Sequence, residues 1–185
     1  VGQIQSQYSK YLLAAASPIS LTGYVLAQGL IQKTVGGVNA ISSALYPRSS
    51  ESSDDSKLRS IYLQLQLGLF GLGLIGVIIY YIFGQNFLLW WLNDPELVAI
   101  MIKVLNVLIW YFVLLIPTPL ASTILDGRGR PELTSIFAFI TTAFEITLAL
   151  VLYPRYGYMA PVYGATIALI LTTPALLYYS TRVLQ

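Results

Sequence analysis

The stretch "LRSIYLQLQLGLFGLGLIGVIIYYIF", Leu58 to Phe83, decides the fold class of this chain. Arg59, next to its start, carries the one charge in the stretch. A helix rises 1.5 Å per residue, so a helix of this length exceeds the roughly 30 Å hydrocarbon core of a bilayer. Apolar runs of roughly 20 residues, enough to cross a membrane, recur along the chain. The sequence therefore predicts an all-α, polytopic transmembrane helix bundle.

The composition of the 185 residues supports this class and excludes several others. Hydrophobic residues make up 56 % of the chain and charged residues 10 %, against about 25 % charged residues in soluble domains. The chain has no Cys and no His, which excludes disulfides, thiolate sites, histidine metal sites and histidine general bases. A net charge of +2 is too small to indicate a nucleic-acid partner. We therefore expect no enzyme active site, no metal and no cofactor, and membrane lipids as partners.

The pattern predicts about five membrane spans within one membrane domain, 1–185. The first span is too long for a single crossing, and we expect it to be kinked or broken near Pro18. Pro117 and Pro119 should distort the third span. Short connections should make successive helices antiparallel neighbours. The predicted spans are 8–46, 58–83, 95–123, 133–152 and 162–183.

The basic residues predict the orientation of the bundle, because short cytoplasmic loops are enriched in Lys and Arg. The 47–59 loop, predicted to be solvated, and the 124–132 loop each carry several basic residues. The 84–94 loop carries none, and the 154–161 loop carries one. We therefore predict that loops 47–59 and 124–132 and the C-terminus face the cytoplasm, in the cell membrane.

The segment "DGRGRPE", 126–132, packs an Asp, two Gly, two Arg, a Pro and a Glu between two apolar spans. Gly127 and Gly129 permit a tight turn, and proline suits the first position of a helix, which predicts a new helix at Pro131. The segment is predicted to be the tip of a cytoplasmic hairpin.

The letters "GLGLIG", 71–76, match the dinucleotide-binding pattern G-x-G-x-x-G. That site requires glycines that end a strand and open a helix, whereas these lie inside a predicted span. We interpret them, together with Gly68, as small residues that let helices approach closely.

Polar side chains inside the spans are the candidate binding residues. Glu145 lies near the middle of the fourth span, where a carboxylate is costly unless it is paired, protonated or hydrated. Nearby threonines indicate that one face of this helix lines a wet cavity; they are Thr141, Thr142 and Thr147. Structural pairing of Glu145 with another helix is the alternative.

A second polar stripe lies in the first span, where Gln28 and Gln32 are one helical turn apart and Lys33 follows. This stripe predicts a cavity wall. The alternative is that Lys33 snorkels to the membrane interface, as we expect for Lys103 in the third span.

Two longer stretches carry a family resemblance. "ALYPRSSESSDDSKLRSIY", 44–62, resembles the helix end, Ser-rich acidic loop and basic-flanked helix start of polysaccharide-export flippases. "IPTPLASTILDGRGRPELTSIFAFITTAFEITLALVLYPRYGYMAPVYGATIA", 116–168, is similar to their later signature. The family is that of the O-antigen type, lipid-linked oligosaccharide flippases, within the multidrug/oligosaccharidyl-lipid/polysaccharide exporter superfamily. Relatives often carry an uncharged polar residue where this chain has Glu145.

The resemblance implies a two-lobed fold of about twelve to fourteen helices, of which this chain would be part of the second lobe. The start at Val1 agrees with a piece of a longer protein, and the missing N-terminal lobe would complete the fold. The implied activity is flipping of a polyprenyl-linked oligosaccharide across the cytoplasmic membrane by alternating access. Lys33 would attract the pyrophosphate of the lipid, and Gly127, Gly129, Pro117 and Pro119 would serve as hinges.

Other functions stay open at this point. A cation-coupled multidrug exporter of the same superfamily would use a buried carboxylate such as Glu145 to bind a proton or Na⁺. A membrane sugar ligase or glycosyltransferase would need a large extramembrane loop with clustered acids, and Asp54 and Asp55 form the one adjacent acidic pair. A membrane subunit without a transport role is the remaining alternative.

Overall fold

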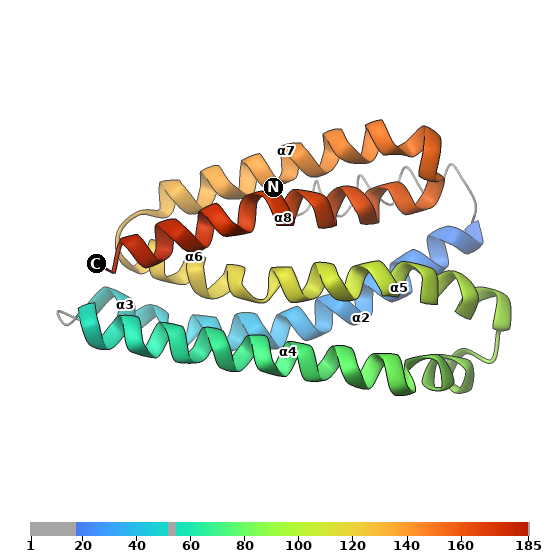
Figure 1. The fold of residues 1–185 in the computed structure, drawn as a ribbon, viewed down its shortest axis with the longest axis horizontal. Helices are drawn as coiled ribbons and strands as arrows, with labels where there is room; N and C mark the ends of the chain where they lie inside the picture. Colours follow the sequence, from blue (N-terminus) through green and yellow to red (C-terminus); the bar gives the residue numbers. More distant parts are fainter. Residues whose placement is uncertain (1–17, 52–54, 185) are drawn as a thin grey trace.

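The computed structural model describes residues 18–51 and 55–184, and every element in these ranges is helical. The predicted all-α bundle is confirmed, and the part of the first predicted span before Pro18 lies outside the described residues. The elements in chain order are α2 (Pro18–Ser43), α3 (Tyr46–Glu51), α4 (Asp55–Leu92), α5 (Pro95–Leu115), α6 (Pro117–Gly127), α7 (Pro131–Tyr156), the 3₁₀ turn η1 (Gly157–Met159) and α8 (Ala160–Arg182). The long helices run side by side along one axis (Figure 1).

Three helical stretches of the described chain are long and apolar enough to cross a membrane: Ser56–Leu92, Pro95–Gly127 and Pro131–Arg182. The last of them is a hairpin, because the chain reverses at Gly157, whose φ is 52°. Its arms α7 and α8 lie against each other along their length (Figure 1). The protein is therefore a multi-pass membrane protein, and the count of five crossings stays a prediction.

The connection between α4 and α5 is much shorter than the predicted 84–94 loop. Helix α4 continues to Leu92 and leaves Asn93 and Asp94 as the turn, so the predicted loop is wrong. The Asp94 carboxylate accepts hydrogen bonds from the backbone N–H groups of Glu96 at 3.0 Å and Leu97 at 3.1 Å. Pro95 occupies the first turn, and together with the Asp94 N-cap it fixes the start of α5. Residues 84–92 contain no comparable signal that would end α4 earlier.

Two further predicted connections are partly helical. The 47–59 loop contains most of α3, whose Ser49 is fully buried, so the prediction of a solvated loop is wrong for this part. Helix α7 runs through Pro154 to Tyr156, past the predicted end at 152. A proline in a helix removes one backbone hydrogen bond, the one to the residue four positions before it. In α7 this loss falls near the last turn, where it is tolerated.

The predicted distortion of the third span is confirmed at Pro117. Helix α5 ends at Leu115 and α6 begins at Pro117, with Ile116 between them in helical conformation. Proline lacks the N–H that would continue the hydrogen-bond ladder, so the axis is interrupted while the chain continues in the same direction. Pro119 lies in the first turn of α6, where a missing N–H costs little.

Two apolar clusters hold the bundle together on both sides of this interruption. One joins α2 and α5 through Tyr24, Ala27, Met101 and Leu108. The other joins α2, α4 and α6 and includes Val38, Tyr62, Ile116, Leu120 and Ile124. Helix α4 keeps a broad apolar face exposed, with Leu67 at 72 % and Trp90 at 79 %. Such a face is expected of a helix whose solvent is lipid.

The 126–132 hairpin tip is a Schellman turn. Gly129 adopts φ 72°, its N–H donates to the Asp126 carbonyl at 3.1 Å, and the Arg130 N–H donates to the Leu125 carbonyl at 2.9 Å. The tight turn predicted for Gly129 is confirmed, and Pro131 begins α7 as predicted.

The two ends of the bundle differ in charge. Helix α3, the connection of α6 to α7 and the end of α8 share one end, at the left of Figure 1, while the α4–α5 turn and η1 lie at the other. The shared end carries Lys57, Arg59, Arg128, Arg130 and Arg182. The loops predicted to be cytoplasmic therefore meet at one end, and the side of the membrane that this end faces stays a prediction.

Candidate functional site

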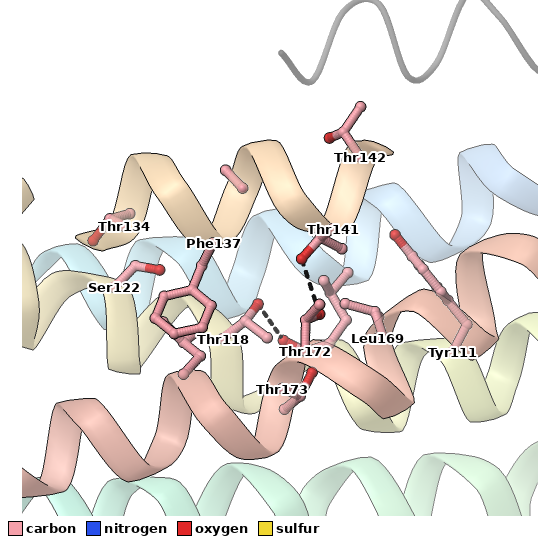
Figure 2. A pocket seen from close by; sticks show the side chains of 13 residues that line it. Tyr111, Thr118, Ser122, Thr134, Phe137, Thr141, Thr142, Leu169, Thr172 and Thr173 are labelled. Carbon is pink, nitrogen blue, oxygen red and sulfur yellow. Dashed lines mark hydrogen bonds between the residues drawn. The ribbon is translucent and has the colours of Figure 1, made fainter. Parts of the chain in front are cut away.

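A cavity of about 240 Å³, which we call the threonine cavity, lies among α5, α6, α7 and α8. Hydroxyl side chains dominate its polar lining, and none of its lining residues is charged. Figure 2 shows Phe137 toward one end of it and Tyr111 toward the other. The hydroxyl residues are Thr118, Ser122, Thr134, Thr141, Thr142, Thr172 and Thr173, with the phenol of Tyr111.

Helical spacing brings these hydroxyls to one place. Thr118 and Ser122 are one turn apart on α6, and 134, 137, 138 and 141 lie on one face of α7. The Thr141 hydroxyl donates to the Thr172 hydroxyl at 2.9 Å, which in turn donates to the Ala168 carbonyl at 2.9 Å (Figure 2 shows the first of these bonds). The α7–α8 pair therefore shares a hydrogen-bonded polar seam inside the membrane segment.

A second cavity of about 190 Å³, which we call the glutamate cavity, lies among α2, α5, α7 and α8. Its polar lining consists of Tyr24, Gln28, Gln32, Tyr111 and Glu145. Glu145 is 5 % exposed, and Tyr111 lies within electrostatic range of both Glu145 and Tyr24. The structure thus brings together three of the predicted site residues, which come from helices far apart in the sequence.

The fourth predicted cavity residue lies elsewhere. Lys33 is exposed and is absent from the linings of both cavities, since it follows Gln32 by about 100° around α2. Lys103 is also exposed, on α5. The polar stripe of α2 therefore divides into amides that face the glutamate cavity and a lysine that faces outward.

Two of the three threonines predicted to face a cavity from the fourth span do so, and whether that cavity is wet stays a prediction. Thr141 and Thr142 line the threonine cavity, whereas Thr147 is exposed, so its inclusion was wrong. Sequence reasoning missed the hydroxyls on α6 and α8 and also Tyr111, which lines both cavities. The signal was present as pairs of hydroxyl residues at helical spacing, such as Thr118 with Ser122, but no such pair identifies its partner helix.

The predicted hinge residues surround α6. Pro117 and Pro119 lie at its start, Gly127 ends it, and Gly129 follows in the turn. A Cβ at Gly127 would meet the side chain of the buried Ser49, so this glycine serves a close contact with α3. Whether these residues act as hinges stays a prediction.

The glycine motif 71–76 lies in the middle of α4. No strand precedes it in the described chain, so it does not have the geometry of a dinucleotide site. A Cβ at Gly73 would meet Ile116, which confirms a close approach there, whereas a Cβ at Gly68, Gly71 or Gly76 would have no neighbour within 4 Å. No helix of the described chain therefore approaches closely at those three glycines.

The MatE family model matches residues 6–151, well over half of the chain. No curated protein sequence was found to match it. MatE proteins are membrane transporters and belong to the superfamily of multidrug, oligosaccharidyl-lipid and polysaccharide exporters, which includes polysaccharide flippases. The helical membrane bundle, its polar internal cavities and this match agree, and the chain belongs to the MatE family of exporters.

Proposed function

We propose that this protein flips polyprenyl-linked oligosaccharides across the cytoplasmic membrane by alternating access, together with a further lobe of the same protein. Family membership supports membrane transport over the sugar ligase or glycosyltransferase considered above. The basic end of the bundle would face the cytoplasm, where positive loops are retained.

The observation that carries the choice of substrate is the lining of the two cavities. They adjoin, since Tyr111 and Leu115 line both. Their polar groups are hydroxyls, phenols and amides, and Glu145 is the one charged residue among them. Hydroxyls and amides both donate and accept hydrogen bonds, as sugar hydroxyls do. A polar tract of this kind, enclosed by membrane helices, suits a polyhydroxylated substrate.

The direct test uses the leaflet distribution of the lipid-linked oligosaccharide in cells. Deletion of the full-length gene should leave this lipid on the cytoplasmic face, measured by its access to a membrane-impermeant glycan-modifying enzyme. The wild-type gene should restore the distribution. An unchanged distribution in a strain without a redundant flippase would contradict the proposal.

The same assay tests the role of Lys33. A Lys33→Ala gene that fails to restore the distribution would support attraction of the pyrophosphate by this exposed lysine. Full restoration would keep the flippase and remove Lys33 from its mechanism.

One observation favours a second candidate, a cation-coupled multidrug exporter: Glu145 is a buried carboxylate in a polar cavity. For such an exporter, Glu145→Gln should abolish the dependence of efflux on a proton gradient and weaken its dependence on a Na⁺ gradient, because the neutral amide takes up no proton and lacks the charge that attracts Na⁺. Ethidium efflux from liposomes under an imposed gradient measures this. Glu132→Gln is the matched control, since Glu132 is 54 % exposed and pairs with Arg130. If wild type exports ethidium and the Glu145→Gln variant exports it with unchanged gradient dependence, this candidate is contradicted. If wild type exports no ethidium, this candidate is excluded.

A further inference from the structure

Two hydroxyls of the threonine cavity have no hydrogen-bond partner in the described chain. They are the Oγ1 atoms of Thr134 and Thr173, and both are buried from solvent. Thr173 as a whole is 5 % exposed. Burying a hydroxyl without a partner costs stability, and native proteins contain few such groups. Their neighbours are satisfied internally: Thr118 donates to the Leu115 carbonyl at 2.9 Å, and Thr141 donates to Thr172. Because solvent does not reach these two oxygens, a ligand in the cavity would bond to them only after the threonine side chains turn toward it.

The size of the cavity limits the part of a ligand that it can hold. A cavity of about 150 Å³ in a protein core accommodates benzene. The threonine cavity, at about 240 Å³, has room for one six-membered ring that carries hydroxyl substituents. It has no room for the several rings of an oligosaccharide at once.

The walls of the cavity indicate the chemistry of the ring. No charged side chain lines it, so a charged ligand would lose its hydration without a compensating partner. Phe137 presents an aromatic surface, and its ring is 5.8 Å from that of Tyr179, which restrains its position. Aromatic rings pack against apolar surfaces, and a pyranose has an apolar C–H face in addition to its hydroxyl edge. Free hydroxyls beside an aromatic wall therefore match a neutral sugar.

We propose that the threonine cavity binds one neutral pyranose ring, which hydrogen-bonds to Thr134 and Thr173 and packs on Phe137. The inference rests on the proposed function, because it names the part of the oligosaccharide that this lobe recognises. It is distinct from pyrophosphate attraction, which involves charge, and from the glutamate cavity, which contains a carboxylate.

Valine substitutions separate ligand binding from a structural role. Thr173→Val and Thr134→Val remove the hydroxyls with little change of shape. Because these hydroxyls have no protein partner, each variant should melt at an equal or higher temperature than wild type. Transport should nevertheless fall about fivefold for each variant, as expected for one lost hydrogen bond to the substrate. Thr147→Val on the exposed face of α7 is the control and should leave both quantities unchanged. Transport at the wild-type rate in the double variant would overturn the proposal and leave the flippase intact.

A binding assay keeps the test valid if the flippase itself fails. The chain has no cysteine, so Ser122→Cys introduces a single thiol in the cavity lining. In the full-length protein freed of any other cysteine and reconstituted in liposomes, hexyl β-glucoside should slow maleimide alkylation of this thiol at least about threefold, while 1-hexanol should not, because a hydroxyl-bonded ring blocks access. Thr34→Cys, on the exposed side of α2, should be unaffected. Added Thr173→Val should abolish the protection. Equal effects of the glucoside and hexanol, or protection that survives Thr173→Val, would contradict the sugar site.

Discussion

Replacement of Gly164 by leucine should be the most destabilising substitution in the α7–α8 hairpin. A Cβ at Gly164 would lie 2.9 Å from the Ala149 nitrogen and 3.0 Å from the Glu145 carbonyl oxygen. Both atoms belong to the backbone of α7, so no rotamer change relieves the contact. Overpacking of a core costs about 1–3 kcal/mol and occasionally more, and a clash with backbone belongs at the upper end of that range. We expect Gly164→Leu to lower the melting temperature steeply and to reduce the yield of folded protein.

A matched control exists on α4. Gly68 also lies in a membrane helix, but a Cβ there would meet nothing within 4 Å. Gly68→Leu should therefore keep or raise the melting temperature, because glycine costs a helix interior up to about 1 kcal/mol relative to alanine. Thermal unfolding of both variants in the same detergent measures the difference. Equal melting temperatures would show that α7 and α8 are not in backbone contact at Gly164.

The second large effect is expected where α6 meets α3. A Cβ at Gly127 would meet Oγ of Ser49 and would lie 2.7 Å from its Cβ. Ser49 is fully buried, and its hydroxyl donates to the Tyr46 carbonyl at 2.8 Å, so it cannot move without breaking that bond. Gly127→Ala should therefore cost about 2 kcal/mol of stability, measured by chemical or thermal unfolding.

Removal of the opposing side chain should restore part of this loss. Ser49→Gly takes away both clashing atoms, so the double variant should be more stable than the sum of the two single effects predicts, by about 1 kcal/mol in a double-mutant cycle. Additive effects would contradict the contact. The hinge prediction is tested separately: transport unchanged by Gly127→Ala with Gly129→Ala, in folded protein, would contradict a hinge at this turn.

The sequence was sufficient for the class of fold and for the strongest local signals. Long apolar runs fix helices in a membrane because each backbone group must find its partner within the helix. The distortion at Pro117 and the turn at Gly129 could be predicted because each residue has a single physical consequence. Pro117 lacks a backbone N–H, and Gly129 allows a left-handed backbone. The ends of α4 and α7 were misplaced, since apolar residues beside weak breakers continue a helix beyond the membrane core.

The cavities could be predicted only in part. Gln28, Gln32 and Glu145 were identified by their polarity, and they converge on one cavity. The outward position of Lys33 depends on the rotation of α2 about its axis, which packing against α5 determines and composition does not. Thr173 has no local signal of its importance, because a threonine in a membrane helix usually bonds to its own backbone. Its lack of a partner is visible only once α6, α7 and α8 are placed together.

The α7–α8 hairpin has a consequence for how the chain enters the bilayer. The bond between Thr141 and Thr172 and the contact at Gly164 join the two arms without help from any other helix. Thr172 already donates to a carbonyl of its own helix, whereas the Thr141 hydroxyl is satisfied once the two arms of the hairpin meet. Helices α7 and α8 are therefore suited to membrane insertion as a pair.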